Sequence, residues 1–229
     1  MTALVRMRLA AFVRSGRALA PLLTGLVVLG LIHGGGQAPA GWAYSDSAVM
    51  LFPVLAWQSK LVLDAEPDVQ RRLARVAVGA GRELTAGLLA ATVLALGTCT
   101  VAMAAPWIFN AIEQPDAGAP PLAVGIALGA LAHLLAVPAA VGLGALAGRA
   151  VTRSILYGVA VVVTGSVLTI VLGLTSSVAP WLVPPVMAVA RALHRDTYAP
   201  GEILLLTGHA VLWSAVALAG YARLRRRRA

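Results

Sequence analysis

The longest charged stretch of the chain runs from Leu61 to Glu83 and reads LVLDAEPDVQRRLARVAVGAGRE. Its acidic residues come first and its arginines follow. Side chains of both signs can form ion pairs, within the chain or with a partner. Asp68 follows Pro67, and both suit the first turn of a helix, where a carboxylate faces the positive end of the helix dipole. Apolar side chains recur at helical spacing and form one stripe, namely Val69, Leu73 and Val76. The pattern predicts an amphipathic helix from about Pro67 to Ala77, with Asp68 paired to Arg72 one turn on.

Three roles are open for this helix. It can lie on anionic lipid, it can be a solvated determinant of membrane topology, or it can dock a cytoplasmic partner. The three leading carboxylates, Asp64, Glu66 and Asp68, would be repelled by an anionic membrane surface. This disfavours a helix held by lipid attraction alone and favours docking.

Residues typical of catalysis are sparse. His133 and His209 stand alone in apolar segments, and no HExxH pair, second metal-ligand cluster or GxSxG elbow accompanies them. An imidazole hydrogen-bonded between helices is the simpler role for each. The only lysine, Lys60, lies in WQSKLVL, so the sequence contains no P-loop for nucleotide phosphates. We therefore expect no catalytic, cofactor-binding or metal-binding residue in this chain.

The elements that position these residues have the composition of a membrane protein. Of the 229 residues, 59% are hydrophobic and 12% are charged, against about 25% charged in soluble domains, and the mean hydropathy is +0.85. The net charge of +9 is divided among short stretches between apolar runs, so nucleic acid is not an expected partner. The single cysteine, Cys99, lies inside an apolar run and is expected to be a small buried side chain.

Six apolar segments are long enough to cross a bilayer, which takes about 20 helical residues. The expected spans are Ala18–Gln37, Trp42–Gln58, Leu84–Ile108, Leu122–Ala147, Ile155–Leu174 and Ile203–Tyr221. The second contains Pro53, which removes one helical hydrogen bond. The expected fold class is an all-α integral membrane protein, with one six-helix transmembrane domain over residues 18–221.

Basic residues set the expected orientation, since Lys and Arg are retained on the cytoplasmic side. A basic amphipathic leader over residues 1–17 carries four, the stretch after the second span five, the link after the fourth span two, and a basic tail over residues 222–229 five. These are sixteen of the 18, and the alternate loops hold only Arg191 and Arg195. We therefore expect a multi-pass protein of the plasma (inner) membrane with both termini, and the charged helix, in the cytoplasm.

One apolar segment does not fit the span count. SVAPWLVPPVMAVARAL, at residues 177–193, is too short to cross comfortably and is broken by Pro180, Pro184 and Pro185. It is expected to be a re-entrant or interfacial outer element before the sixth span, or a hydrophobic loop on the outer membrane surface.

Small residues four apart allow helices to approach closely in lipid. The fourth span and the residue after it contain two such pairs, Gly125 with Gly129 and Gly144 with Gly148. They predict helix packing, either within the chain or between subunits.

The leader MTALVRMRLAAFVRSGR, the six spans and the stretch LDAEPDVQRRLARVAVG together resemble the small permease subunits of ABC type-2 exporters, of the actinobacterial type. The resemblance implies that the first cytoplasmic loop, about residues 64–79, is a coupling helix that seats in a cleft of a separate ATPase subunit. It implies a smaller second contact at GRAVTRS, residues 148–154. The coupling residues it implies are Asp64, Glu66, Asp68, Arg71, Arg72, Leu73, Arg75, Arg149 and Arg153.

The resemblance also implies the partners. Two permeases, identical or related, would assemble with two ATPase subunits that bind ATP and Mg, in contact with membrane lipids. The expected function is to couple ATP hydrolysis in that partner to export of a hydrophobic or amphipathic substrate, and the chain itself is expected not to be an enzyme. The alternative is a non-transporting membrane anchor or scaffold that recruits a cytoplasmic partner through the same helix. An intramembrane enzyme using His133 or His209 is a third hypothesis.

Overall fold

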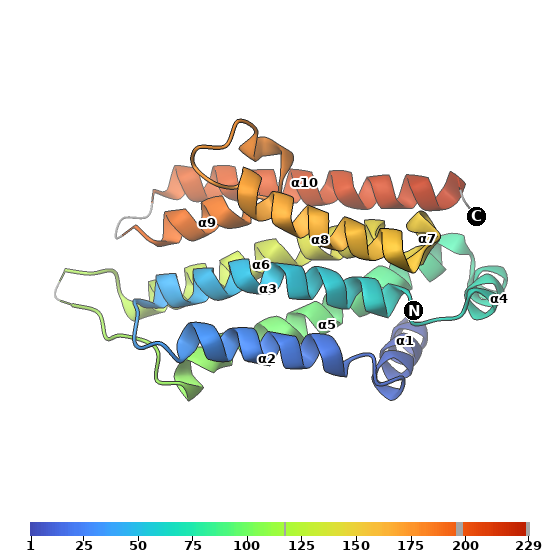
Figure 1. Cartoon of the computed structure of the whole chain (residues 1–229), viewed down its shortest axis with the longest axis horizontal. Helices are drawn as coiled ribbons and strands as arrows, with labels where there is room; N and C mark the ends of the chain where they lie inside the picture. The colour runs from blue at the N-terminus through green and yellow to red at the C-terminus, as the bar shows by residue number, and fades with distance from the viewer. Residues whose placement is uncertain (117, 196–198, 228–229) are drawn as a thin grey trace.

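The structure, a computed structural model, describes residues 1–116, 118–195 and 199–227, and this part of the chain is helical without a strand. Its elements are α1 (Thr2–Arg14), α2 (Leu19–His33), α3 (Ala40–Leu63), α4 (Asp68–Val78), α5 (Ala80–Ile108), α6 (Leu122–Leu146), α7 (Arg149–Thr152), α8 (Ile155–Leu172), the 3-10 turn η1 (Pro180–Leu182), α9 (Val186–Leu193) and α10 (Pro200–Arg227). The long helices lie side by side along the long axis, and α1 and the end of α10 lie at the same end of the bundle (Figure 1).

Several helices are suited to a bilayer. Four stretches are each long and apolar enough to cross it, namely Ala80–Ile108, Leu122–Thr152, Ile155–Leu172 and Pro200–Arg227. The bent pairs α1 with α2 and α3 with α4 also qualify when each is taken as one unit, and their bends are 79° and 75°. Large apolar side chains on the outside of the bundle, such as Leu156 and Leu205, are exposed, as lipid-facing side chains are. The chain is a membrane-embedded helical protein with four to six candidate spans.

The central helix of the bundle is α3. It packs against α2, α5, α6, α8 and α9, and most of its residues are buried. Its buried polar side chains are satisfied within the protein: Ser59 donates to the carbonyl oxygen of Leu55 (2.7 Å), and Gln58 accepts a hydrogen bond from Thr98 of α5 (3.1 Å). Because protein covers α3, these groups avoid the cost of polar atoms facing hydrocarbon.

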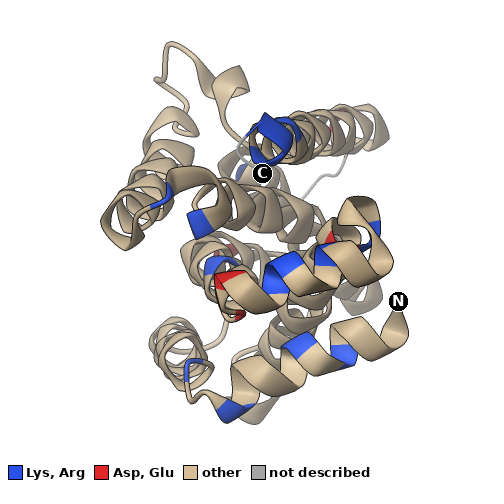
Figure 2. Ribbon diagram, turned by 90° about the vertical axis from the view of Figure 1, so that its right-hand side faces the viewer, with Lys and Arg blue, Asp and Glu red and all other residues tan. Residues whose placement is uncertain are grey.

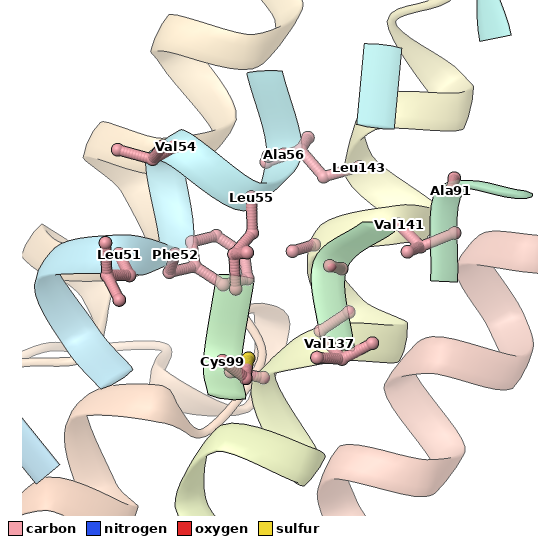
Figure 3. Packing of buried hydrophobic residues seen from close by; sticks show 14 of the residues in the cluster. Leu51, Phe52, Val54, Leu55, Ala56, Ala91, Cys99, Val137, Val141 and Leu143 are labelled. Atoms are coloured by element: carbon pink, nitrogen blue, oxygen red, sulfur yellow. The ribbon is translucent and has the colours of Figure 1, made fainter. Parts of the chain in front are cut away.

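The largest apolar cluster joins α3, α5 and α6 (Figure 3). Leu51, Phe52 and Leu55 of α3 belong to it, together with Cys99 of α5 and Val137 of α6. Alanines dominate the contributions of α5 and α6, so the backbones approach closely and dispersion contacts hold the helices together. Cys99 is buried in this cluster, as its apolar surroundings in the sequence predict.

All six predicted segments are helical, but their limits differ from the prediction. The second, expected at Trp42–Gln58, runs from Ala40 to Leu63, because hydrogen bonds and ion pairs inside the protein satisfy its polar ends. The first is shorter than predicted and ends at His33, before a run of three glycines. The predicted leader folds as α1. The predicted tail continues α10 to Arg227, and residues 228–229 lie outside the described ranges.

The proline-broken segment at residues 177–193 forms η1 and α9. Helix α9 packs against α3, α6, α8 and α10 and buries Val186, Val189 and Leu193. At its end the His194 imidazole lies 2.9 Å from the Asp46 carboxylate and is stacked on Trp42. The bundle therefore covers α9, whereas η1 is exposed.

Candidate functional site

One end of the bundle, which we call the basic end, is formed by α1, α4, α7 and the last turns of α10. Figure 2 looks onto it and shows α1 and α4 lying across the ends of the long helices, with Lys and Arg residues on all four elements. The bends that follow α1 and precede α4 turn these two helices away from the axes of α2 and α3. A single glycine, Gly79, then connects α4 to α5 with φ 87°, a conformation that favours glycine.

A buried carboxylate, Glu83 of α5, organises the first half of this end. Its side chain is fully buried, and it accepts hydrogen bonds from Arg8 of α1 (2.6 Å) and Arg225 of α10. Arg75 of α4 lies 3.5 Å from the same carboxylate. Three guanidinium groups from three different helices therefore converge on Glu83.

Arg8 itself bridges two carboxylates. It donates to both carboxylate oxygens of Glu66, at 3.0 and 2.8 Å, in addition to Glu83. The guanidinium lies against Gly87 of α5, where a Cβ atom would collide with it. Bidentate, charge-assisted bonds of this kind are the strongest hydrogen bonds between side chains, so Arg8 joins α1 to the α3–α4 loop and to α5.

A second carboxylate, Asp64, joins α3 to α7. It accepts from Lys60 Nζ (2.8 Å) and from the backbone N–H of Arg149 (2.7 Å). The Arg149 guanidinium donates to the carbonyl oxygen of Asp64 at 2.9 Å. Because Asp64 receives both a side chain and a backbone group, it fixes the position of the link between α6 and α8.

The three carboxylates of the predicted coupling set differ in their surroundings. Asp64 and Glu66 are both buried and bonded inside the chain. Asp68 is exposed and pairs with Arg71 three residues on, where the sequence predicted Arg72 four residues on. Asp64 and Glu66 therefore hold the basic end together, and Asp68 is the exposed member of the three carboxylates.

Helix α4 presents two different faces. Arg71, Arg72 and Arg75 line one cavity together with residues of α7 and α10, so its charged face is turned to the bundle. The apolar stripe is on the other side, with exposed fractions of 68% at Val69, 65% at Leu73 and 87% at Val76. In a soluble protein an amphipathic helix packs its apolar face on the core and exposes its charged face. In α4 the apolar face is the exposed one.

The cavity behind α4, which we call the basic pocket, has a volume of about 310 Å³. Its lining consists of Asp68, Arg71, Arg72, Arg75, Arg149, Ala150, Arg153 and Arg225. Arg153 follows the short helix α7 with φ 60°, in the left-handed region that non-glycine residues seldom adopt. The predicted main and secondary coupling segments therefore meet at one pocket.

The four predicted packing glycines lie along α6 and at its end, and the structure places their contacts within the chain. A Cβ at Gly125 would lie 3.0 Å from that of Ala40, and one at Gly129 would overlap Tyr44. At Gly144 it would lie 2.7 Å from Ser59 Cβ, whereas at Gly148 the nearest α3-side atom, Asp64 Oδ1, is at 3.5 Å. The first three allow close approach of α6 to α3, and Gly148 is less tightly packed.

The histidines considered for catalysis make helix contacts. His133 Nδ1 donates to the carbonyl oxygen of Gly129 (2.9 Å), and its Nε2 lies 3.2 Å from Ser47 Oγ of α3. His209 Nε2 lies 3.3 Å from the carbonyl oxygen of Trp181. Among the residues that the structure describes, no three His, Cys, Asp or Glu side chains form a group able to hold a metal ion.

Sequence reasoning did not identify Arg8, Glu83 and Arg225 as one unit. Their separations of 75 and 142 residues leave no local pattern. The available signal was that Glu83 is an acid at the very start of an apolar span, where an unpaired charge is costly.

Comparison of the chain with protein families, with curated proteins and with solved structures gives no match.

Proposed function

We propose that the chain is a six-span permease subunit of an ATP-driven exporter of the ABC type-2 kind, and that its basic end faces the cytoplasm. The orientation is supported by the Lys and Arg residues of α1, α4, α7 and α10, because the cytoplasmic side retains such residues. Both chain ends would then lie in the cytoplasm, and the ATPase partner would bind the permease at the cytoplasmic face of the plasma (inner) membrane.

The observation that carries the proposal is the outward apolar stripe of α4. Three large apolar side chains on one short polar helix lose contact with water only when something covers them. The arginines of α4 border a pocket with α7 and α10, and the stripe is not part of that lining, so the stripe is open to a partner. A protein surface with an apolar groove is the cover that fits this position.

The charge of the preceding loop supports this choice less than the sequence suggested. Two of the three leading carboxylates, Asp64 and Glu66, are paired internally, so they repel an anionic membrane only weakly. The exposed stripe of α4 is what favours a docked protein, and α7 with Arg149 and Arg153 would provide a second contact beside it. The sequence has no P-loop, so ATP and Mg would bind to the partner.

The substrate class is supported by an apolar cavity of about 400 Å³ between α2, α3 and α8. Pro53, Trp57 and Val163 are among its lining residues. A mostly apolar wall suits a hydrophobic cargo or the apolar part of an amphipathic one. A second permease, identical or related, is the expected assembly partner.

Replacing Leu73 by Glu is expected to weaken capture of the ATPase by about tenfold or more, because a carboxylate would be buried in the apolar groove of the partner. The measurement is co-purification of an ATPase subunit with the tagged full chain, extracted from its native membrane and assayed for ATP hydrolysis. Gln70→Glu is the matched control, since it adds the same charge to α4 at an exposed position about a quarter turn from the stripe.

The outcomes separate the hypotheses. Loss of the ATPase with Leu73→Glu but not with Gln70→Glu, together with ATP-dependent transport by reconstituted vesicles, supports the permease. A partner that depends on Leu73 but hydrolyses no ATP would indicate a membrane scaffold. Equal capture by both variants would exclude the stripe as the docking surface.

A further inference from the structure

The basic end carries more positive charge than its own carboxylates balance. Its pocket and ion pairs contain eight basic side chains, namely Arg8, Lys60, Arg71, Arg72, Arg75, Arg149, Arg153 and Arg225. The carboxylates paired with them are Asp64, Glu66, Asp68 and Glu83. Eight cations face four carboxylates, so four positive charges are unbalanced around one part of the molecule. Like charges held this close repel, and a bound anion relieves the repulsion.

Two arginines of the pocket have no carboxylate partner of their own. Arg71, Arg75, Arg149 and Arg225 each have a carboxylate partner. Arg72 and Arg153 line the same pocket, and neither makes an ion pair or a side-chain hydrogen bond with any described residue. The two free guanidinium groups come from different segments, α4 and the residue after α7, and both border the pocket.

The lining also restricts the chemistry of the anion. Every basic residue of the basic pocket is an arginine, whose planar fork makes paired hydrogen bonds to phosphate oxygens. The volume of about 310 Å³ is at the lower limit of small-ligand pockets, which begin at about 300 Å³. A phosphate group with a small substituent fits such a space and can carry more than one negative charge.

We propose that the basic pocket binds a phosphate-bearing anion through Arg72 and Arg153. Two sources provide this chemistry: the headgroup of an anionic phospholipid, and a soluble phosphate. The helices that line the pocket, α4, α7 and α10, meet at the end of the bundle, which is the level of lipid headgroups for a bundle that crosses a bilayer. The proposal does not depend on the transport function, because it rests only on the charges and the cavity.

The test uses the full chain purified in a neutral detergent. Three probes are added separately: phosphatidic acid, inorganic phosphate and, as a zwitterionic comparison, phosphatidylcholine. The thermal unfolding midpoint is measured for each, and native mass spectrometry counts bound lipid. Saturating phosphatidic acid or phosphate is expected to raise the midpoint by about 5 °C, and phosphatidylcholine is expected to leave it unchanged.

Two variants assign the effect to the pocket. Arg72→Gln and Arg153→Gly are each expected to weaken binding by about tenfold, since each removes a charge-assisted contact. Glycine adopts the left-handed backbone at φ 60° without strain, so the fold of Arg153→Gly is expected to be kept, and the unfolding midpoint of the variant without ligand checks this. Arg223→Gln is the control, because Arg223 is exposed on α10 and does not line the pocket.

The probes distinguish the two sources. A response to phosphatidic acid alone identifies a lipid headgroup, and a response to inorganic phosphate, with or without the lipid, shows that a soluble phosphate is sufficient; both results support the proposal. It is overturned if neither probe binds the wild-type chain, or if Arg72→Gln and Arg153→Gly bind as tightly as Arg223→Gln.

Discussion

Replacing Glu83 by Gln is expected to lower the free energy of unfolding by about 3–5 kcal/mol, the cost of removing one partner from a buried ion pair. Glutamine keeps the size of the side chain but not its charge, so the guanidinium of Arg225 is left buried beside a neutral amide. Arg8 keeps its two bonds to Glu66. The measurement is the thermal unfolding midpoint of the full chain in detergent, together with its yield from the membrane.

The matched control for this change is Glu113→Gln, which removes an exposed carboxylate from the α5–α6 connection. It is expected to change stability by less than about 0.5 kcal/mol. The double variant Glu83→Gln with Arg225→Gln is expected to be more stable than the sum of the single changes predicts, because it removes the unpaired charge as well. Equal midpoints for Glu83→Gln and Glu113→Gln would contradict a stabilising role of Glu83.

Replacing Gly144 by Ala is expected to destabilise the bundle by about 1–3 kcal/mol or more, although it adds a single methyl group. The added Cβ would lie 2.7 Å from Ser59 Cβ and 2.8 Å from the backbone nitrogen of Lys60. A backbone atom of α3 cannot rotate away as the end of a side chain can, so α6 and α3 must separate along part of their interface. The unfolding midpoint of the full chain in detergent reports this loss.

Gly97→Ala provides the control on a neighbouring helix. Gly97 lies within α5, and a Cβ there would meet no atom within 4 Å. Alanine is favoured over glycine in a helix by up to about 1 kcal/mol, so this variant is expected to be neutral or slightly stabilising. If both variants lower the midpoint equally, close packing at Gly144 is not the cause of its effect.

The sequence was sufficient to predict the helices because apolar length and helical spacing are local properties. The charged helix, predicted at Pro67–Ala77, lies at Asp68–Val78. Its two faces were also readable, as Val69, Leu73 and Val76 form the stripe. Which face turns to the bundle was not readable, because that depends on Arg153 and Arg225 being brought behind it from distant segments.

Burial of charge was the main feature that the sequence did not reveal. Asp64 and Glu66 have the local pattern of an exposed acidic cluster, yet each is covered because a basic residue from elsewhere pairs with it. A single sequence contains no record of these long-range pairs. The end of α3 was predicted too early for a different reason: the charge of Lys60 interrupts the apolar run, but an ion pair to Asp64 four residues on keeps Lys60 within the buried helix.

The contacts of Glu83 set an order on biosynthesis. Along the chain Arg8 is translated first, Glu66 and Glu83 follow, and Arg225 comes only after the whole of the other long helices. While the nascent chain is being inserted, Arg8, Glu66 and Glu83 can already associate, but the second guanidinium bond to Glu83 must wait for α10. A chain whose synthesis stops before α10 therefore leaves the Glu83 carboxylate without one of its guanidinium partners, at the start of an apolar helix where unpaired charge is costly.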